Sequence, residues 1–448
     1  GNISNSEYYD FVPEHIITIY QNTTFNTSCW NNIDINFNNS HINYKFSNKT
    51  SLFCSDLILW GPVNNLQINT FLSPSSGSIK INNHKLFNFY GFNVFNFKNG
   101  IFGSINSIIK TYGLFKGPNI VKNNIDFLHQ EMGLNISSSH LHPIPNSSSL
   151  KSGDVLLITA FDGLDQLIMW GTGSTVGHTA MALEFPDGLY IIESTDKNPF
   201  GHTLWPPPYG FIKTPYLKWM ELAKKADYQV RLVKLNTTYH NILQDKLELV
   251  HTWWNKYQGH PYGYYNLLWP WIDTINDNFP KSLSKEFVVS SLYFLNKHNL
   301  ITDVVNNWFS YSFNKRIETL TNQTSDRNFT QIIDWTIDNN LKLWDLWILP
   351  EQDNYQYNNS ISRVCVTLIL SVYKLVGIIP ENIQVTEFTG KDFYQLKVWE
   401  NWNNKSSTIQ ILGDYNISLP NWNTIDLYPT MNQKCPSLSK NYLRSPNC

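Results

Sequence analysis

Residues 361–377, ISRVCVTLILSVYKLVG, are the clearest predicted helix in the chain. Apolar residues cover every face of this helix, and a helix that is apolar all round is buried. Ser362 is the expected N-cap, and Gly377, followed by Pro380, is expected to end the helix. Cys365 then lies in the first turn, where unpaired amides and the positive end of the helix dipole favour a thiolate.

A β-hairpin upstream of this helix offers a base. The stretches TVGHTAMALEF (175–185) and GLYIIEST (188–195) flank a turn that contains Pro186 and Asp187. His178 stands in an otherwise small and apolar strand, where a histidine is uncommon unless a function uses it. A lone buried cysteine is more often an inert core residue. We therefore interpret Cys365 as a nucleophile only because His178 offers a matching base.

The same hairpin offers an acid that would orient the base. Side chains alternate along a strand with a period of two, so Glu193 projects from the same face as His178 whether the turn is tight or longer. With a loop of about four residues the two lie directly opposite each other, close enough for a carboxylate–imidazole hydrogen bond. Glu184, on the same strand as His178, is the alternative orienting residue. The prediction is a triad of Cys365, His178 and Glu193.

The order of these motifs resembles a known family, the circularly permuted papain-like hydrolases of the NlpC-like branch, in which His precedes Cys along the chain. That group is similar in fold to lecithin:retinol acyltransferases and to bacterial cell-wall amidases. The resemblance implies acyl transfer through a thioester, with Cys365 as nucleophile, His178 as base and Glu193 as orienting residue. The motifs that carry it span residues 150–380 and are GDVLLITAF (153–161), GHTAMALEF (177–185), IIEST (191–195), HPYGYYNLLW (260–269) and RVCVTLILSVYKLVGI (363–378).

Aromatic residues near these motifs are candidates for substrate contacts. The backbone N–H of Cys365 is the first expected donor to the oxygen of the reacting carbonyl group, and Tyr262 is a candidate second donor. Trp205 and Tyr209 flank a Pro-rich loop and are candidates to line a groove for substrate, because aromatic faces suit both sugars and lipids. His140 and His142 form a pair without further ligands at metal-binding spacing, so no metal and no cofactor is expected.

Composition indicates a glycoprotein of the secretory pathway. Charged residues make up only 15% of the 448 residues, against about 25% in typical soluble domains. The chain starts without a signal peptide, as a processed N-terminus would. We expect a secreted, lysosomal or phagosomal location, and N-linked glycans that solubilise the surface. N-x-Ser/Thr sequons occur at Asn2, Asn22, Asn26, Asn38, Asn48, Asn135, Asn146, Asn236, Asn322, Asn328, Asn358, Asn404 and Asn416.

The five cysteines agree with this route. Two local disulfides, Cys29–Cys54 and Cys435–Cys448, leave Cys365 as a free thiol, although sequence alone permits other pairings. The net charge of −2 and the lack of a Lys/Arg cluster argue against nucleic acid as a partner. The longest apolar stretch is interrupted by Lys374 and is too short to span a bilayer, so no transmembrane segment is expected. The oligomeric state stays open.

The expected fold class is α+β, with an antiparallel sheet packed on the buried helix that carries Cys365. We divide the chain into a β-rich region (1–147), a permuted papain-like catalytic domain (148–380) with a helical insertion at about 240–360, and a C-terminal extension (381–448). The leading functional hypothesis is a cysteine amidase or peptidase, with bacterial cell-wall peptides as one substrate class. The alternatives are a lipid acyl hydrolase or acyltransferase with the same site, and a non-catalytic glycoprotein that keeps the fold.

Overall fold

The computed structural model divides the chain into two compact units. The first consists of residues 1–112, 283–348 and 438–443, and the second of residues 113–282, 349–437 and 444–448. The predicted boundaries after residues 147 and 380 both lie inside the second unit. The structure describes residues 14–26, 30–38, 40–49, 56–60, 66–69, 75–81, 84–97, 109–138, 143–196, 205–263, 289, 292–293, 296, 310–346, 363–381, 383, 385, 388–400 and 409–425.

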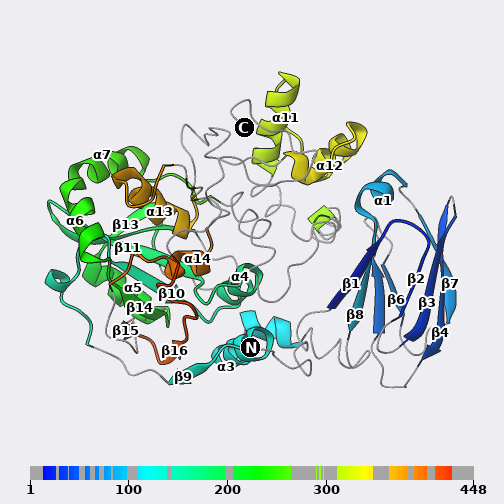
Figure 1. The fold of residues 1–448 in the computed structure, drawn as a ribbon, viewed down its shortest axis with the longest axis horizontal. Helices are drawn as coiled ribbons and strands as arrows, with labels where there is room; N and C mark the ends of the chain where they lie inside the picture. The colour runs from blue at the N-terminus through cyan, green and yellow to red at the C-terminus, as the bar shows by residue number, and fades with distance from the viewer. Residues whose placement is uncertain are drawn as a thin grey trace. The chain divides into compact units, whose positions relative to one another are not determined.

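A six-stranded sheet forms the centre of the second unit (Figure 1). Its strand order is β13-β12-β11-β10-β14-β15, and every neighbouring pair is antiparallel. The expected hairpin between residues 175 and 195 is confirmed, and the last strand of the sheet comes from the C-terminal part of the chain. The strands are β10 (Val155–Thr159), β11 (His178–Phe185), β12 (Gly188–Thr195), β13 (Gly210–Pro215), β14 (Gln229–Val233) and β15 (Ile409–Leu412).

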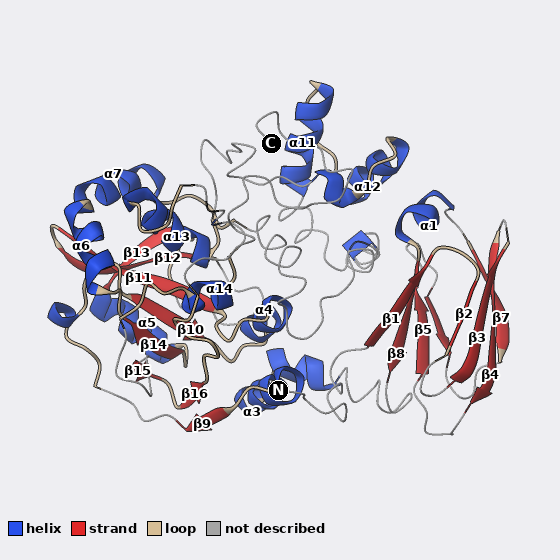
Figure 2. Cartoon of the chain, in the orientation of Figure 1, coloured by secondary structure: helices blue, strands red, loops and turns tan. Residues whose placement is uncertain are grey.

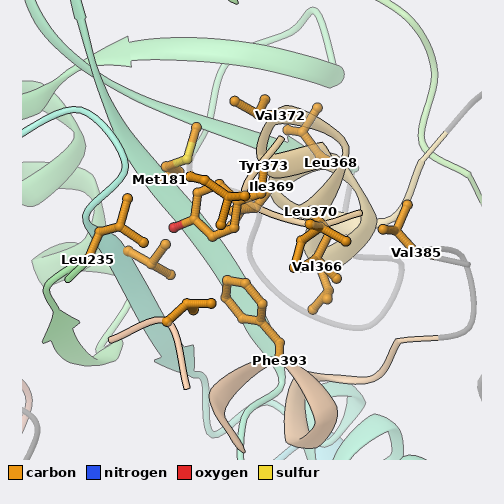
Figure 3. Close-up of a cluster of buried hydrophobic side chains, with 14 of the residues drawn as sticks. Met181, Leu235, Val366, Leu368, Ile369, Leu370, Val372, Tyr373, Val385 and Phe393 are labelled. Carbon is orange, nitrogen blue, oxygen red and sulfur yellow. The ribbon is translucent and has the colours of Figure 1, made fainter. Parts of the chain in front are cut away.

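Both faces of this sheet are buried, and each is covered by helices. Side chains alternate between the faces: Leu157 and Met181 join the apolar cluster around helix α13 (Cys365–Val376), whereas Leu156 and Ala180 join the cluster around helix α5 (Tyr216–Lys225). Helix α13 is buried along its length, as residues 361–377 predict. Figure 3 shows its side chains against Met181, Leu235 and Phe393.

The remaining elements of the second unit lie around this core. Helix α3 has buried residues at helical spacing and ends at Gly133, whose φ of 62° is left-handed. The elements are α3 (Ile120–Met132), β9 (Ile136–Ser138), the 3₁₀ helix η1 (Ser147–Ser149), α4 (Leu164–Thr172), α6 (Thr237–Asp245), α7 (Leu247–Tyr257), α14 (Gly390–Gln395) and β16 (Tyr415–Ile417), and β9 pairs with β16.

The first unit contains two four-stranded antiparallel sheets (Figure 2). One has the order β1-β8-β5-β6 and the other β2-β3-β4-β7. Ile19 and Val94 of the first sheet share an apolar core with Ile33 and Ile42 of the second. The strands are β1 (Glu14–Ile19), β2 (Thr23–Phe25), β3 (Trp30–Phe37), β4 (His41–Lys49), β5 (Asp56–Trp60), β6 (Leu66–Asn69), β7 (Ser76–Lys80) and β8 (Phe92–Phe97).

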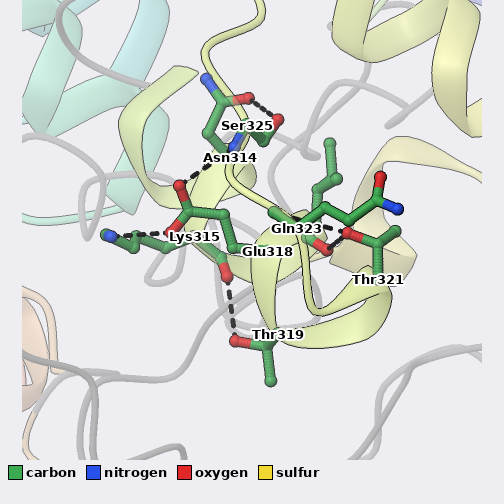
Figure 4. A network of polar contacts seen from close by, with 8 residues as sticks. Asn314, Lys315, Glu318, Thr319, Thr321, Gln323 and Ser325 are labelled. Atoms are coloured by element: carbon green, nitrogen blue, oxygen red, sulfur yellow. Dashed lines mark hydrogen bonds and ion pairs between the residues drawn. The ribbon is translucent and has the colours of Figure 1, made fainter.

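Helices complete the first unit: α1 (His84–Tyr90), α11 (Tyr311–Thr321), α12 (Phe329–Asp338) and the 3₁₀ helix η4 (Leu343–Leu346). The Tyr90 hydroxyl accepts a hydrogen bond from the amide of Leu343 at 3.1 Å. Polar contacts join α11 to the following loop (Figure 4): the Ser325 hydroxyl donates to Asn314 at 2.6 Å, and Lys315 pairs with Glu318 at 2.7 Å.

One aromatic run of the N-terminal region, FNFYGFNVFNF (87–97), is divided between a helix and a strand. Its first part ends helix α1, and residues from Phe92 onward form β8. Leu86, Phe87 and Tyr90 are buried on one side of α1, which explains why this aromatic segment is helical. Gly91, with φ of 66°, separates the helix from the strand.

The described sequon asparagines suit modification. Asn236 is half-buried and caps α6 by accepting a hydrogen bond from the amide of Thr238, which leaves its amide nitrogen for a sugar. The Asn48 side chain and residues 2, 358 and 404 lie outside what the structure describes. The sequon asparagines with exposed side chains are Asn22, Asn26, Asn38, Asn135, Asn146, Asn322, Asn328 and Asn416.

If these residues carry glycans, the protein made in a eukaryotic secretory host should lose mass when it is treated with an endoglycosidase. Substitution of Thr238 by Val should remove one glycan because it destroys the sequon at Asn236 while leaving the capping side chain in place. An unchanged mass after the enzyme treatment would contradict the proposed secretory route.

A second prediction concerns the end of α13. Gly377 adopts φ of 86°, a left-handed conformation, and its surroundings leave space for a side chain. Gly377→Ala should lower the free energy of unfolding by about 1–2 kcal/mol, because residues with a Cβ are strained there. Gly377→Asn is the matched control and should cost less, since Asn tolerates this conformation. Equal denaturant midpoints for all three proteins would contradict the C-cap assignment.

Candidate active site

Cys365 is the first residue of α13. The expected N-cap was Ser362, but the helix begins later, and Val364 is the N-cap, with φ −78° and ψ 172°. The Cys365 side chain is 7% exposed and is the free cysteine within the described residues. No described residue accepts a hydrogen bond from the Cys365 amide. The sulfur therefore lies at the positive end of a helix with an unpaired N–H beside it.

His178 is the first residue of β11 and contacts both other members of the predicted triad. Its Nε2 lies 2.8 Å from Oε2 of Glu193, and its ring forms a hydrogen bond with Cys365. Since Nε2 faces the carboxylate, Nδ1 is the ring nitrogen left for the sulfur. The predicted grouping of Cys365, His178 and Glu193 is thus present in the structure.

The register of the hairpin differs from the one that a four-residue loop would give, in which Glu193 lies directly opposite His178. Met181 pairs with Ile192 and Phe185 with Gly188, because only Pro186 and Asp187 form the turn. Glu193 therefore lies diagonally across from His178, on the same face but not directly opposite. The imidazole still reaches the carboxylate because diagonal neighbours remain within the reach of a long side chain.

Glu193 and Cys365 approach His178 from opposite sides of the sheet. Glu193 lies on the face covered by α5, where it also accepts a hydrogen bond from the indole of Trp219 at 2.8 Å. Cys365 belongs to the cluster around α13 on the other face. Because His178 begins its strand, its ring is free to reach both. The side chain of His178 is 17% exposed, so part of the ring keeps contact with solvent.

Two hydrogen bonds fix the Glu193 carboxylate, which is only 2% exposed. A buried carboxylate needs such partners, since burial without them is costly. The alternative orienting residue, Glu184, lies at the far end of β11 opposite Leu189, with an exposed side chain. Glu193 is therefore the acid that contacts the base.

The Cys365–His178 pair favours the charged forms of both groups. Burial alone would raise the pKa of Cys365, but the charge and hydrogen bond of His178, with hydrogen bonds from Thr179, lower it. Burial alone would likewise lower the pKa of His178, but interactions with Cys365 and Glu193 raise it well above its usual value. Such an arrangement stabilises a thiolate beside an imidazolium, which is the reactive form of a cysteine nucleophile.

Asp165 is a neighbour that the sequence analysis missed. It lies in the first turn of α4, and its Oδ2 accepts a hydrogen bond from the amide of Ala160 at 2.7 Å. Burial, followed by the charge of Asp162, raises the pKa of Asp165 to about 8. His178 and Cys365 also act on it electrostatically. Its position depends on a loop contact, and no periodic pattern in the sequence signals that contact.

The three aromatic candidates have different positions. Tyr262 pairs with Arg363 in a short parallel bridge, close in the chain to Cys365. Tyr209 is half-buried directly before β13. Trp205 is 7% exposed and packs against Trp219 on the α5 side of the sheet, behind Glu193. Tyr262 is therefore the aromatic candidate that lies beside the segment leading to Cys365.

Several other predictions concern residues that the structure does not describe. Cys29, Cys54, Cys435 and Cys448 lie outside the described residues, as do His140 and His142, so both disulfides remain predictions. Within the described ranges, no cluster of three or more His, Cys, Asp or Glu side chains could hold a metal ion. In the same ranges, no helix has the length and apolar character to cross a bilayer.

Comparison of the chain with protein-family models, with curated proteins and with solved structures found no match. The candidate site therefore rests on the geometry of its own side chains.

The ion pair predicts the reactivity of the thiol. His178→Ala should slow alkylation of Cys365 by iodoacetamide at neutral pH about ten-fold or more, because the thiol pKa rises and only the thiolate reacts. His240→Ala is the matched control, since His240 bonds the carbonyl of Ser152 and not the triad. Cys365→Ser gives the background from the other cysteines. Equal rates in wild type and His178→Ala would contradict the pairing.

Proposed function

We propose that this chain is a cysteine hydrolase that cleaves acyl bonds, with amide and peptide bonds as the leading substrate class. The observation that carries the proposal is the continuous contact from Cys365 through His178 to Glu193. Each member has the partner that its role requires: a nucleophile beside a base, and a base held by a buried acid.

The chemistry follows from this geometry. The Cys365 thiolate attacks the acyl carbon, and the His178 imidazolium donates its proton to the leaving nitrogen as the C–N bond breaks. A thioester remains on Cys365. Water then attacks the thioester, His178 takes its proton, and the thiolate leaves as the acid product forms. Glu193 holds the imidazole and stabilises its charge in both steps.

Architecture supports a permuted papain-like core. The nucleophile begins a buried helix that packs on an antiparallel sheet, and the base lies on a neighbouring strand that precedes it in the chain. Exposed sequons support a secreted or lysosomal location. Peptide stems of bacterial cell walls are the substrates to test first, and phospholipids are the alternative acyl donors, because the same three residues serve ester cleavage.

The proposal predicts a graded loss of turnover. Cys365→Ser and His178→Ala should reduce hydrolysis to background, because each removes a group that takes part in bond making or proton transfer. Glu193→Gln should lose roughly 10²- to 10⁴-fold and keep residual activity, because it only orients and stabilises the imidazole. Glu184→Gln, at the exposed end of β11, is the matched control and should behave as wild type. Peptidoglycan fragments and phospholipid vesicles are assayed side by side, with thermal unfolding to check folding.

The outcomes separate the hypotheses. Release of peptide or amine products supports the amidase, whereas release of fatty acid or transfer of an acyl chain supports the lipid enzyme. Hydrolysis that persists unchanged in folded Cys365→Ser would contradict both. A thiol that neither turns over a substrate nor reacts with iodoacetamide at neutral pH would leave a non-catalytic glycoprotein.

A further inference from the structure

Asp165 lies beside the reacting pair. Its side chain is 9% exposed. Its Cγ approaches Gly177 so closely that a Cβ added to that glycine would lie 2.3 Å from it. Gly177 directly precedes His178, and Asp165 interacts electrostatically with both His178 and Cys365. The missing side chain at Gly177 therefore lets a carboxyl group come close to the catalytic histidine.

The two carboxyl oxygens of Asp165 differ in their partners. Oδ2 accepts the hydrogen bond from the Ala160 amide. Across the described part of the chain, Oδ1 has no hydrogen-bonding partner. Oδ1 is not one of the fully buried side-chain atoms that lack a partner, so it keeps some exposure and a ligand can reach it. With a pKa raised to about 8, the group is a neutral acid at neutral pH, and Oδ1 then carries an O–H donor.

We propose that Asp165 binds substrate by donating a hydrogen bond from Oδ1 to the oxygen of the acyl group that Cys365 attacks. This inference rests on the proposed hydrolase function. The Cys365 amide and the Asp165 acid then supply two donors to the oxygen on which negative charge develops, in a site of low dielectric constant. The proton stays on Asp165 throughout, so the acid differs in role from His178, which transfers protons.

Asp165 can donate this hydrogen bond only while it is protonated, and neighbouring charges affect its protonation. Asp162 lies one turn before it and, through its negative charge, favours the neutral acid. The Cys365 thiolate acts in the same direction, whereas His178 acts in the opposite one. Burial raises the pKa of the Tyr228 phenol, and the charge of Asp165 acts in the same direction.

The test compares Asp165→Asn with Asp165→Leu in the intact 448-residue chain. Asn reproduces the pattern of the neutral acid, with an oxygen for the Ala160 amide and an N–H donor, whereas Leu has a similar size and no donor. The probe is p-nitrophenyl acetate at about pH 6, where Asp165 is protonated. Asp165→Leu should lose about 10²- to 10³-fold in Cys365-dependent ester cleavage, and Asp165→Asn should stay within about ten-fold of wild type.

Two further readouts exclude a purely structural role. Iodoacetamide forms no oxyanion, so alkylation of Cys365 should be nearly unchanged in both variants. In wild type, ester cleavage should fall above about pH 8 as Asp165 loses its proton, and this loss should be absent in Asp165→Asn. If Asp165→Leu does not fold, the pH profile of Asp165→Asn still tests whether Asp165 acts as a hydrogen-bond donor.

The proposal is overturned if Asp165→Leu cleaves the ester as wild type does, if Asp165→Asn loses as much as Asp165→Leu, or if the alkaline loss persists in Asp165→Asn. These results would leave the hydrolase assignment intact as long as cleavage depends on Cys365. Ester cleavage that is the same in Cys365→Ser and wild type would instead remove the proposed function, and the role of Asp165 with it.

Discussion

A thiolate and an imidazolium can be buried together because the attraction between their opposite charges offsets the hydration that each group loses on burial. Cys365 and His178 meet this condition, and Glu193 provides the second anion that keeps the imidazole charged. The surrounding fold brings these three side chains together. Helix α13 brings the thiol to one face of the sheet, the α5 side holds the carboxylate with Trp219, and a histidine at the start of β11 contacts both. A histidine inside the strand would face one side only.

The contact of Cys365 and Glu193 with His178 could be predicted because each of the three residues carries a local signal. An all-apolar stretch around Cys365 predicts a buried helix, and a histidine in a strand of small residues is conspicuous. Strand periodicity places Glu193 on the face of His178 whenever the loop of the hairpin has an even number of residues. The register itself could not be predicted, because it depends on the turn formed by Pro186 and Asp187.

What the sequence did not reveal depends on contacts between distant segments. Asp165 is part of an ordinary helix start, and only the approach to Gly177 places it at the site. Trp205 is an aromatic residue in a loop, and only the packing of α5 shows that it lies behind Glu193. The strand β15 comes from the C-terminal part of the chain, but its pairing with β14 is a tertiary contact. The positions of these residues and of this strand are set by tertiary contacts, so they could not be predicted from local sequence patterns.

The most direct test of the ion pair is an NMR titration of the His178 ring nitrogens in protein labelled at histidine. In wild type both ring nitrogens should remain protonated well above the usual histidine range, because the thiolate and Glu193 hold the charge. In Cys365→Ser the pKa of His178 should fall, since the sulfur anion is gone. A ring that titrates at its ordinary pKa in both proteins would contradict the pairing on which this account depends.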